Sequence, residues 1–253
     1  MPADWKGSIP CCIMQLNKQP LCCFPDLLGF GFSDRPADWD YSLESHAETI
    51  YQILHMREET MNPFLVIQTV FDALTRPKQL VVIQEIPSGR VIDIGGGGEG
   101  VIAQAGGAGI VAIDRYISEI HEARGKAPTA AWMVADATDL PFVSHCFDNA
   151  TAFFSCMYMT DDTKQKAFRE ARRVLKEGGE FWIWDAHMVP RGKAFAIRLR
   201  VDLQDIPTIN TMYGVRAQVQ SAASIGGLLL EAGFEPEVIA NHKHWFLIKA
   251  RRT

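Results

Sequence analysis

One short segment constrains the fold of this 253-residue chain most strongly, because an apolar run there stops abruptly in glycines. Residues 91–94, Val-Ile-Asp-Ile, are typical of a buried strand, and residues 95–100, Gly-Gly-Gly-Gly-Glu-Gly, follow directly. A glycine turn lets a ligand approach the backbone, and a helix that begins there presents its first amides to that ligand. The segment therefore predicts a strand, turn and helix of an α/β fold that binds a nucleotide-like cofactor.

Composition narrows the class of partner. The chain is 47% hydrophobic and 22% charged, which suits one sizeable core. A net charge of −5 argues against a broad phosphate-binding face, so we expect a small-molecule partner rather than nucleic acid. The sequence has no apolar run long enough to suggest a membrane span, and its first residues do not resemble a secretion signal. We therefore expect a cytoplasmic protein without a membrane partner.

Strand-like and helix-like runs alternate through the second part of the chain. Such alternation predicts a parallel sheet with helices on both faces, and right-handed crossovers make a doubly wound sheet the simplest closure. The expected strands cover residues 90–94, 110–113, 131–134, 149–154 and 180–185, and the expected helices cover residues 98–105, 117–124 and 163–175.

Both ends of this region carry further elements. Residues 63–74 have helical spacing and should cover a sheet edge. Residues 225–232 predict a helix that ends at Gly233, and runs 237–240 and 244–250 predict an antiparallel pair of strands.

An insertion with regular alternation follows the fifth expected strand. Residues 195–203 alternate as a half-buried strand, and residues 208–216 could return as its partner. The resulting β-ribbon is either a cap over the substrate or an edge hairpin that only extends the core, and alternation alone does not separate these two interpretations.

The six cysteines do not predict a metal site. Four of them form the adjacent pairs Cys11-Cys12 and Cys22-Cys23, which lack the spacing that converges on zinc. Cys146 and Cys156 stand alone. We expect free, reduced thiols and no bound metal.

Three acidic residues stand at the ends of successive expected strands. Asp93 precedes the glycines, Asp114 ends the second strand, and Asp136 ends the third. Gly95, Gly97 and Gly100 satisfy the pattern G-x-G-x-x-G, and an acid after the second strand can accept hydrogen bonds from ribose hydroxyls. These features suit NAD and adenosyl cofactors alike, although each acid could also merely cap the next helix.

Later motifs separate the two cofactors. Val-Ala-Asp-Ala at 134–137, Leu-Pro-Phe at 140–142, Phe-Asp-Asn-Ala-Thr at 147–151 and the run 172–180 follow in this order. The series closely resembles class I S-adenosylmethionine-dependent methyltransferases over roughly residues 62–250. The resemblance implies a Rossmann-like sheet of seven strands in the order 3-2-1-4-5-7-6, with the seventh antiparallel.

The same resemblance implies roles for individual residues. The glycine loop would lie against the methionine part of S-adenosylmethionine, Asp114 would bind the ribose, and Asp136 would bind the adenine amino group. One departure is that the family's common pattern D-x-G-x-G-x-G would place its third glycine at position 99, where this chain has Glu99 followed by Gly100. The implied cofactor-binding residues are Asp93, Gly95, Gly96, Gly97, Gly100, Asp114, Arg115, Asp136, Ala137 and Ser155.

Methyl transfer from a sulfonium is an in-line displacement, so a general base is optional. If the acceptor needs one, Asp185 and His187 are the candidates, and Tyr158 offers a polar group at the end of the fourth strand. The alternatives are ordinary packing for the 156–159 segment and a surface role for His187. Resemblance to methyltransferases that modify exocyclic amino groups of nucleic acids would require an Asn-Pro-Pro-Tyr-like sequence, and none follows Asp148. Together with the acidic net charge, this favours a small metabolite as acceptor.

Residues 1–60 differ from the rest, and we expect an N-terminal extension there and a methyltransferase domain over 61–253. Residues 26–54 resemble an α/β-hydrolase segment with the pattern D-x-x-G-x-G-x-S-x-x-P, but the chain has no nucleophile elbow. The extension is therefore interpreted as a fused remnant, a misplaced start, or a lid. An NAD-dependent oxidoreductase and a non-catalytic adenosyl-binding protein remain alternative functions.

Overall fold

The computed structural model describes residues 78–189, 194–204, 206–216 and 218–253, and every structural statement below concerns these residues. The expected helix over 63–74, the extension 1–60 and the four paired cysteines lie outside them. Within the described ranges, Cys146 and Cys156 are free thiols.

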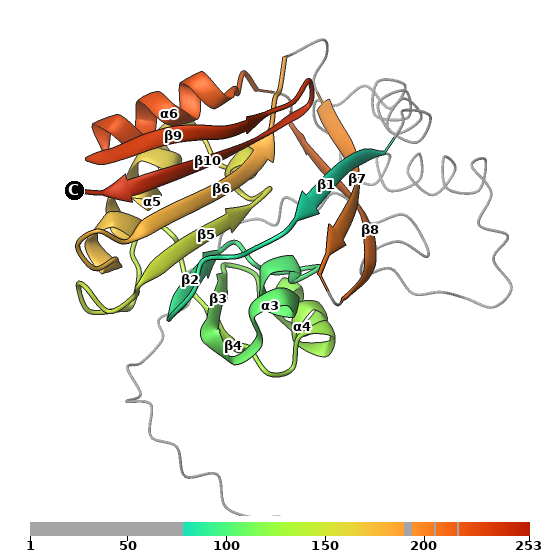
Figure 1. Ribbon diagram of the computed structural model, residues 1–253, viewed down its shortest axis with the longest axis horizontal. Helices are drawn as coiled ribbons and strands as arrows, with labels where there is room; N and C mark the ends of the chain where they lie inside the picture. Colours follow the sequence, from blue (N-terminus) through green and yellow to red (C-terminus); the bar gives the residue numbers. More distant parts are fainter. Residues whose placement is uncertain (1–77, 190–193, 205, 217) are drawn as a thin grey trace, which may run out of the picture.

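A seven-stranded mixed sheet forms the centre of the molecule (Figure 1). Its order is β4-β3-β2-β5-β6-β10-β9, and β10 runs antiparallel to both of its neighbours while the other pairs are parallel. The expectation of a Rossmann-like α/β fold with a mixed sheet is confirmed. The strands are β2 (Val91–Ile94), β3 (Ile110–Asp114), β4 (Ala131–Val134), β5 (Asn149–Phe153), β6 (Glu180–Ala186), β9 (Phe234–Asn241) and β10 (Trp245–Arg252).

Local capping decides where the helices begin. The helices are α3 (Val101–Gly106), α4 (Ile117–Lys126), α5 (Asp161–Val174) and α6 (Ala222–Glu231), with short 3₁₀ turns η1 (Gly107–Gly109) and η2 (Cys156–Tyr158). Helix α6 begins earlier than its apolar pattern predicts, because Ser221 and Ser224 form a reciprocal capping box. Helix α3 begins later than expected, because Gly100 takes a left-handed conformation with φ 59°.

One face of the sheet is covered by α5 and α6. Phe168 of α5 and Leu229 of α6 are buried in one cluster with strand residues such as Ile92, Ile183 and Phe246. Burying this apolar area is the main source of stability on this face.

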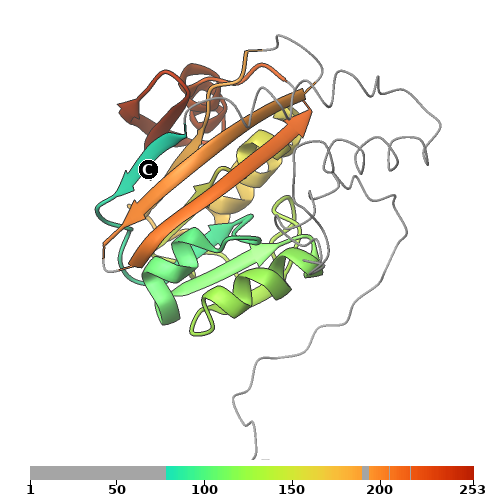
Figure 2. The ribbon, with the colours of Figure 1, turned by 90° about the vertical axis from the view of Figure 1, so that its right-hand side faces the viewer.

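The opposite face carries α3 and a second sheet of three strands. Strand β7 (Ala194–Leu203) lies between β1 (Gln79–Ile83), to which it is parallel, and β8 (Ile206–Arg216), to which it is antiparallel. Figure 2 shows β7 and β8 side by side in front of the main sheet. Leu199 and Val201 are fully buried in the cluster that also contains Trp184, so this sheet belongs to the core. Strand β1 is absent from the sequence-based prediction.

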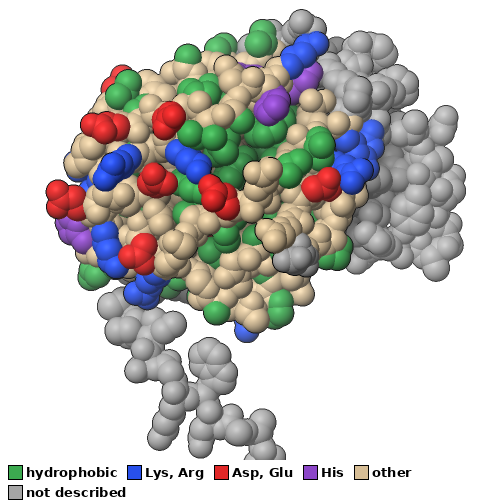
Figure 3. Space-filling model, in the orientation of Figure 1, with side chains coloured by type: hydrophobic (Ala, Val, Ile, Leu, Met, Phe, Trp, Pro, Cys, Tyr) green, Lys and Arg blue, Asp and Glu red, His purple; other side chains and the backbone are tan. Residues whose placement is uncertain are grey.

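The surface drawn in Figure 3 carries charges of both signs around apolar side chains. Lys249 makes contacts of both kinds, because its ammonium nitrogen lies 3.4 Å from the centre of the Trp182 ring and 3.1 Å from a carboxylate oxygen of Glu85. None of the described helices is long and apolar enough to cross a membrane. A cytoplasmic location and the absence of nucleic-acid partners stay predictions.

Candidate functional site

The glycine loop after β2 is packed tightly against two carboxylates. The amides of Gly95 and Gly96 donate to the Ile113 carbonyl at 2.9 and 3.0 Å, which joins the ends of β2 and β3. A Cβ at Gly96 would overlap a carboxylate oxygen of Asp93, and one at Gly97 would lie 2.8 Å from a carboxylate oxygen of Asp114. The loop can adopt this position only because these residues lack side chains.

Asp93 is buried beneath the loop. Its carboxylate accepts a hydrogen bond from the Thr151 hydroxyl at 2.8 Å. Burial raises the pKa of Asp93 to about 7, although the Thr151 bond lowers it, and the nearby charge of Asp114 raises it further. The side chain therefore changes its ionisation near neutral pH.

Asp114 lies at the end of β3, half-buried beside the same loop. It accepts the Tyr116 amide at 2.9 Å. Burial raises the pKa of Asp114 above its ordinary value, and the backbone amides of Tyr116, Gly97 and Arg115 together with the Arg115 charge oppose this rise. Arg115 itself is exposed. The structure thus brings Asp114 and Asp93 together at the glycines.

Asp136 is exposed at the end of β4. It accepts the amide of Thr138 at 2.9 Å and the Thr138 hydroxyl at 2.7 Å, so it fixes its own turn. Burial raises the pKa of Asp136, but the Thr138 bonds and the Arg115 charge lower it by more, and the net shift is downward. Ala137 packs against the core on the α5 side. Asp136 therefore stays ionised at neutral pH.

Ser155 supports the loop from the end of β5. Its hydroxyl donates to the Ile94 carbonyl at 2.7 Å, and a Cβ at Gly95 would lie 2.5 Å from the Ser155 Cβ. The preceding residue, Phe154, has φ 50°, which is unusual for a residue with a side chain. Such strain persists only where the surroundings fix it, and it occurs often at functional sites.

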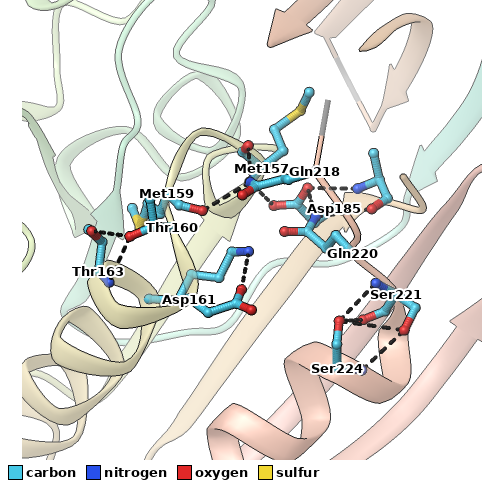
Figure 4. Close-up of polar contacts among 12 residues, drawn as sticks. Met157, Met159, Thr160, Asp161, Thr163, Asp185, Gln218, Gln220, Ser221 and Ser224 are labelled. Atoms are coloured by element: carbon cyan, nitrogen blue, oxygen red, sulfur yellow. Dashed lines mark hydrogen bonds and ion pairs between the residues drawn. The ribbon is translucent and has the colours of Figure 1, made fainter. Parts of the chain in front are cut away.

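Asp185 is fully buried where β6, η2 and the segment before α6 meet (Figure 4). Its carboxylate accepts the amides of Met157 at 3.1 Å and Ala186 at 2.7 Å, and the side-chain amide of Gln220 at 2.8 Å. Burial raises the pKa of Asp185 to about 6, while these bonds and the Lys164 charge lower it. In this arrangement the carboxylate holds η2 in place.

Tyr158 and His187 lie in different surroundings. Tyr158 belongs to η2 and is 52% exposed. His187 has Nε2 2.8 Å from the Asn241 side-chain oxygen, and its ring lies against Phe246. Its imidazole is therefore directed towards β9 and away from the glycine loop. Their catalytic roles stay predictions.

Sequence reasoning missed Tyr213, which β8 brings to the Phe154 ring with centroids 5.6 Å apart. The only sequence signal for it was its place in the alternating run. Among the described residues, no group of three or more His, Cys, Asp or Glu could hold a metal ion.

Comparisons with known proteins find similarity to methyltransferases. Residues 92–183 match the family model of a methyltransferase domain. The ubiquinone/menaquinone biosynthesis C-methyltransferase of Cereibacter sphaeroides is 32% identical over 114 residues, which are 41% of this chain and 45% of that protein. The enzyme of the same description from Acidiphilium cryptum is 26% identical over 166 residues, 62% of this chain and 64% of that protein.

The chain thus spans about half to two thirds of the length of these relatives. A solved structure, the PH0226 protein of Pyrococcus horikoshii, has a TM-score of 0.50 and 17% identity over 77% of this chain and 93% of its own, which supports the fold alone. These matches give no support to a hydrolase segment at 26–54. Residues 92–183, which carry the glycine loop and the acidic ends of β2, β3 and β4, are similar to a methyltransferase domain.

Proposed function

We propose that this chain is an S-adenosylmethionine-dependent methyltransferase that acts on a small-molecule acceptor. The observation that carries the proposal is the packing of Gly96 against Asp93 and of Gly97 against Asp114, inside the region similar to methyltransferase domains. The glycines let the backbone of the loop lie directly against both carboxylates. Two acids beside it suit a cofactor with ribose hydroxyls and a cationic end.

Each part of the cofactor has residues to hold it. The glycine loop would receive the methionine part, Asp114 the ribose hydroxyls, and Asp136 with the Ala137 backbone the adenine amino group. When bound, the cofactor supplies a methyl group on a sulfonium that is already a good leaving group. The task of the protein is therefore to align the acceptor and exclude water.

The acceptor side is formed by η2 and the neighbouring aromatic residues. Tyr158 is exposed on η2, and Asp185 fixes η2 through the Met157 amide. We therefore assign Asp185 a positioning role unless the acceptor needs a base. Relatives described as ubiquinone/menaquinone biosynthesis C-methyltransferases make a reduced quinone the first acceptor to test.

Calorimetry tests the cofactor assignment. The chain should bind S-adenosylhomocysteine and not NAD, and binding of NAD alone would support the oxidoreductase alternative. Replacing Asp114 with alanine should weaken S-adenosylhomocysteine binding about tenfold or more, because hydrogen bonds to a charged group contribute about 1.5–3 kcal/mol. Asp162→Ala, on the exposed start of α5, is the matched control and should leave the affinity unchanged.

Transfer of a labelled methyl group tests catalysis. We expect label in a reduced quinone or another small aromatic acceptor. If no label leaves the cofactor across a broad panel of acceptors, although S-adenosylhomocysteine binds, the chain is a non-catalytic cofactor-binding protein.

A further inference from the structure

Tyr213 reaches the candidate site from the second sheet. In β8 its side chain shares the inner face with Ile209, and it packs against the core that also contains Phe154. The two rings are stacked, with an interplanar angle of 13° and centroids 5.6 Å apart. Strand β8 contacts both α3, which follows the glycine loop, and η2.

The Phe154 ring connects Tyr213 to the glycine loop. Phe154 directly precedes Ser155, whose hydroxyl is bonded to the Ile94 carbonyl and whose Cβ faces Gly95. The left-handed backbone at Phe154 turns the chain between these two contacts. Tyr213 is therefore stacked on the residue adjacent to the support of the loop.

The exit of β8 is fixed to η2 and β6. The Gln218 side-chain amide donates to the carbonyls of Met157 at 2.8 Å and Met159 at 3.0 Å, as Figure 4 shows. Two residues later, Gln220 donates to Asp185 and exchanges two backbone bonds with Met188. These bonds hold the end of β8, and with it Tyr213, in place relative to the loop.

The charges around Tyr213 are acidic. Burial, then the neighbouring Tyr158 and the negative charges of Glu99 and Asp93, raise the pKa of Tyr213 well above its usual range, against a bond from Thr211 that lowers it. The hydroxyl is therefore neutral and lies within the field of Glu99 in the glycine loop and of Asp93 beneath it. Glu99 also pairs with Lys126 at 3.0 Å. Neutral oxygen and acidic groups together favour a cationic ligand group.

We propose that Tyr213 is a cofactor-binding residue, supplied by the second sheet, whose hydroxyl binds the ammonium group at the methionine end of S-adenosylmethionine. This inference rests on the proposed function. The three-stranded sheet then serves the cofactor side of the site as well as the core.

Two ligands separate this role from a structural one. S-adenosylhomocysteine has the amino-acid ammonium group, and 5′-methylthioadenosine lacks it. Tyr213→Phe keeps the stacking on Phe154, so the fold and the thermal unfolding temperature should be preserved. Because one hydrogen bond is lost, we expect S-adenosylhomocysteine to bind about fivefold to tenfold more weakly. Binding of 5′-methylthioadenosine should be unchanged.

Met212→Ala is the control, because Met212 lies on the opposite face of β8, and both affinities should stay as in the wild type. If Tyr213→Phe loses affinity equally for both ligands, or loses none for S-adenosylhomocysteine, this inference fails while the proposed function stands. If the wild-type chain binds neither ligand, the proposed function and this inference both fail.

Discussion

Asp93 is buried with a pKa near neutrality, whereas Asp136 is exposed with a lowered pKa, although both stand at the ends of apolar strands. The difference comes from the residues around each carboxylate. Gly96 lies over Asp93 and excludes water, while Thr138 donates two bonds to Asp136. Their positions can be predicted from strand ends, but their ionisation cannot, because it depends on packing across strands.

The raised pKa of Asp93 predicts a pH-dependent stability. The folded-state pKa of about 7 lies above the ordinary value of 3.8, so the contribution of Asp93 to stability is complete below pH 3.8 and is lost as pH rises through 7. Asp93→Asn removes this loss, so the stability of the variant relative to wild type should increase between pH 4 and 8, by about 4 kcal/mol at most. Urea unfolding of both proteins at several pH values measures this difference in stability.

Asp185 does not disturb this comparison, because its pKa is raised in the same direction and it is present in both proteins. If the difference in unfolding free energy between Asp93→Asn and wild type does not change with pH, the pKa of Asp93 is not raised in the folded protein.

Two glycine substitutions should have opposite effects on stability. Gly96→Ala would force a methyl group onto the Asp93 carboxylate, so we expect a destabilised protein that has lost cofactor binding. Gly226→Ala lies within α6, where an added Cβ meets nothing within 4 Å, and should stabilise by about 1 kcal/mol. Thermal unfolding and calorimetry compare the two, and a normal Gly96→Ala protein would contradict the packing described for the loop.

At the scale of elements, β7 shows how far alternation is informative. The pattern of residues 195–203 predicts a half-buried strand, and residues 194–203 form one. It does not show what the apolar face covers, since that depends on the pairing with β1 and on the tryptophans of β6. For the same reason neither Tyr213 nor Phe154 could be assigned to the site from sequence. Helix starts depend on capping bonds such as that of Thr160 at α5, which apolar spacing does not report.

Neighbouring residues of β7 should differ in their effect on stability. Leu199 is fully buried, so Leu199→Ala should cost about 2–5 kcal/mol in the free energy of unfolding. Arg200 is exposed beside it and pairs with Asp202, so Arg200→Ala should change stability by about 0.5 kcal/mol or less. If the second sheet were only loosely attached, urea unfolding would show similar changes in stability for the two substitutions.

At the scale of the whole molecule, the residues expected to hold the cofactor, from Asp93 to Ser155, lie inside the region 92–183 that is similar to a methyltransferase domain. We therefore expect deletion of residues 1–55 to leave the affinity for S-adenosylhomocysteine nearly intact. Calorimetry of the full-length and shortened chains provides the measurement. A large loss of affinity would assign the N-terminal segment to the cofactor site and refute its interpretation as a remnant.

The parallel pairing of β1 with β7 also sets an order of events during synthesis. Val81 leaves the ribosome before the glycine loop, but its partner Val201 emerges only after β6 is complete. Pairings between distant parts of a chain form slowly, because the intervening loop must first be closed. A nascent chain that stops before residue 194 therefore has no β7 to cover Val81 and Ile83, and these side chains stay open to chaperones or aggregation until the last quarter of the protein arrives.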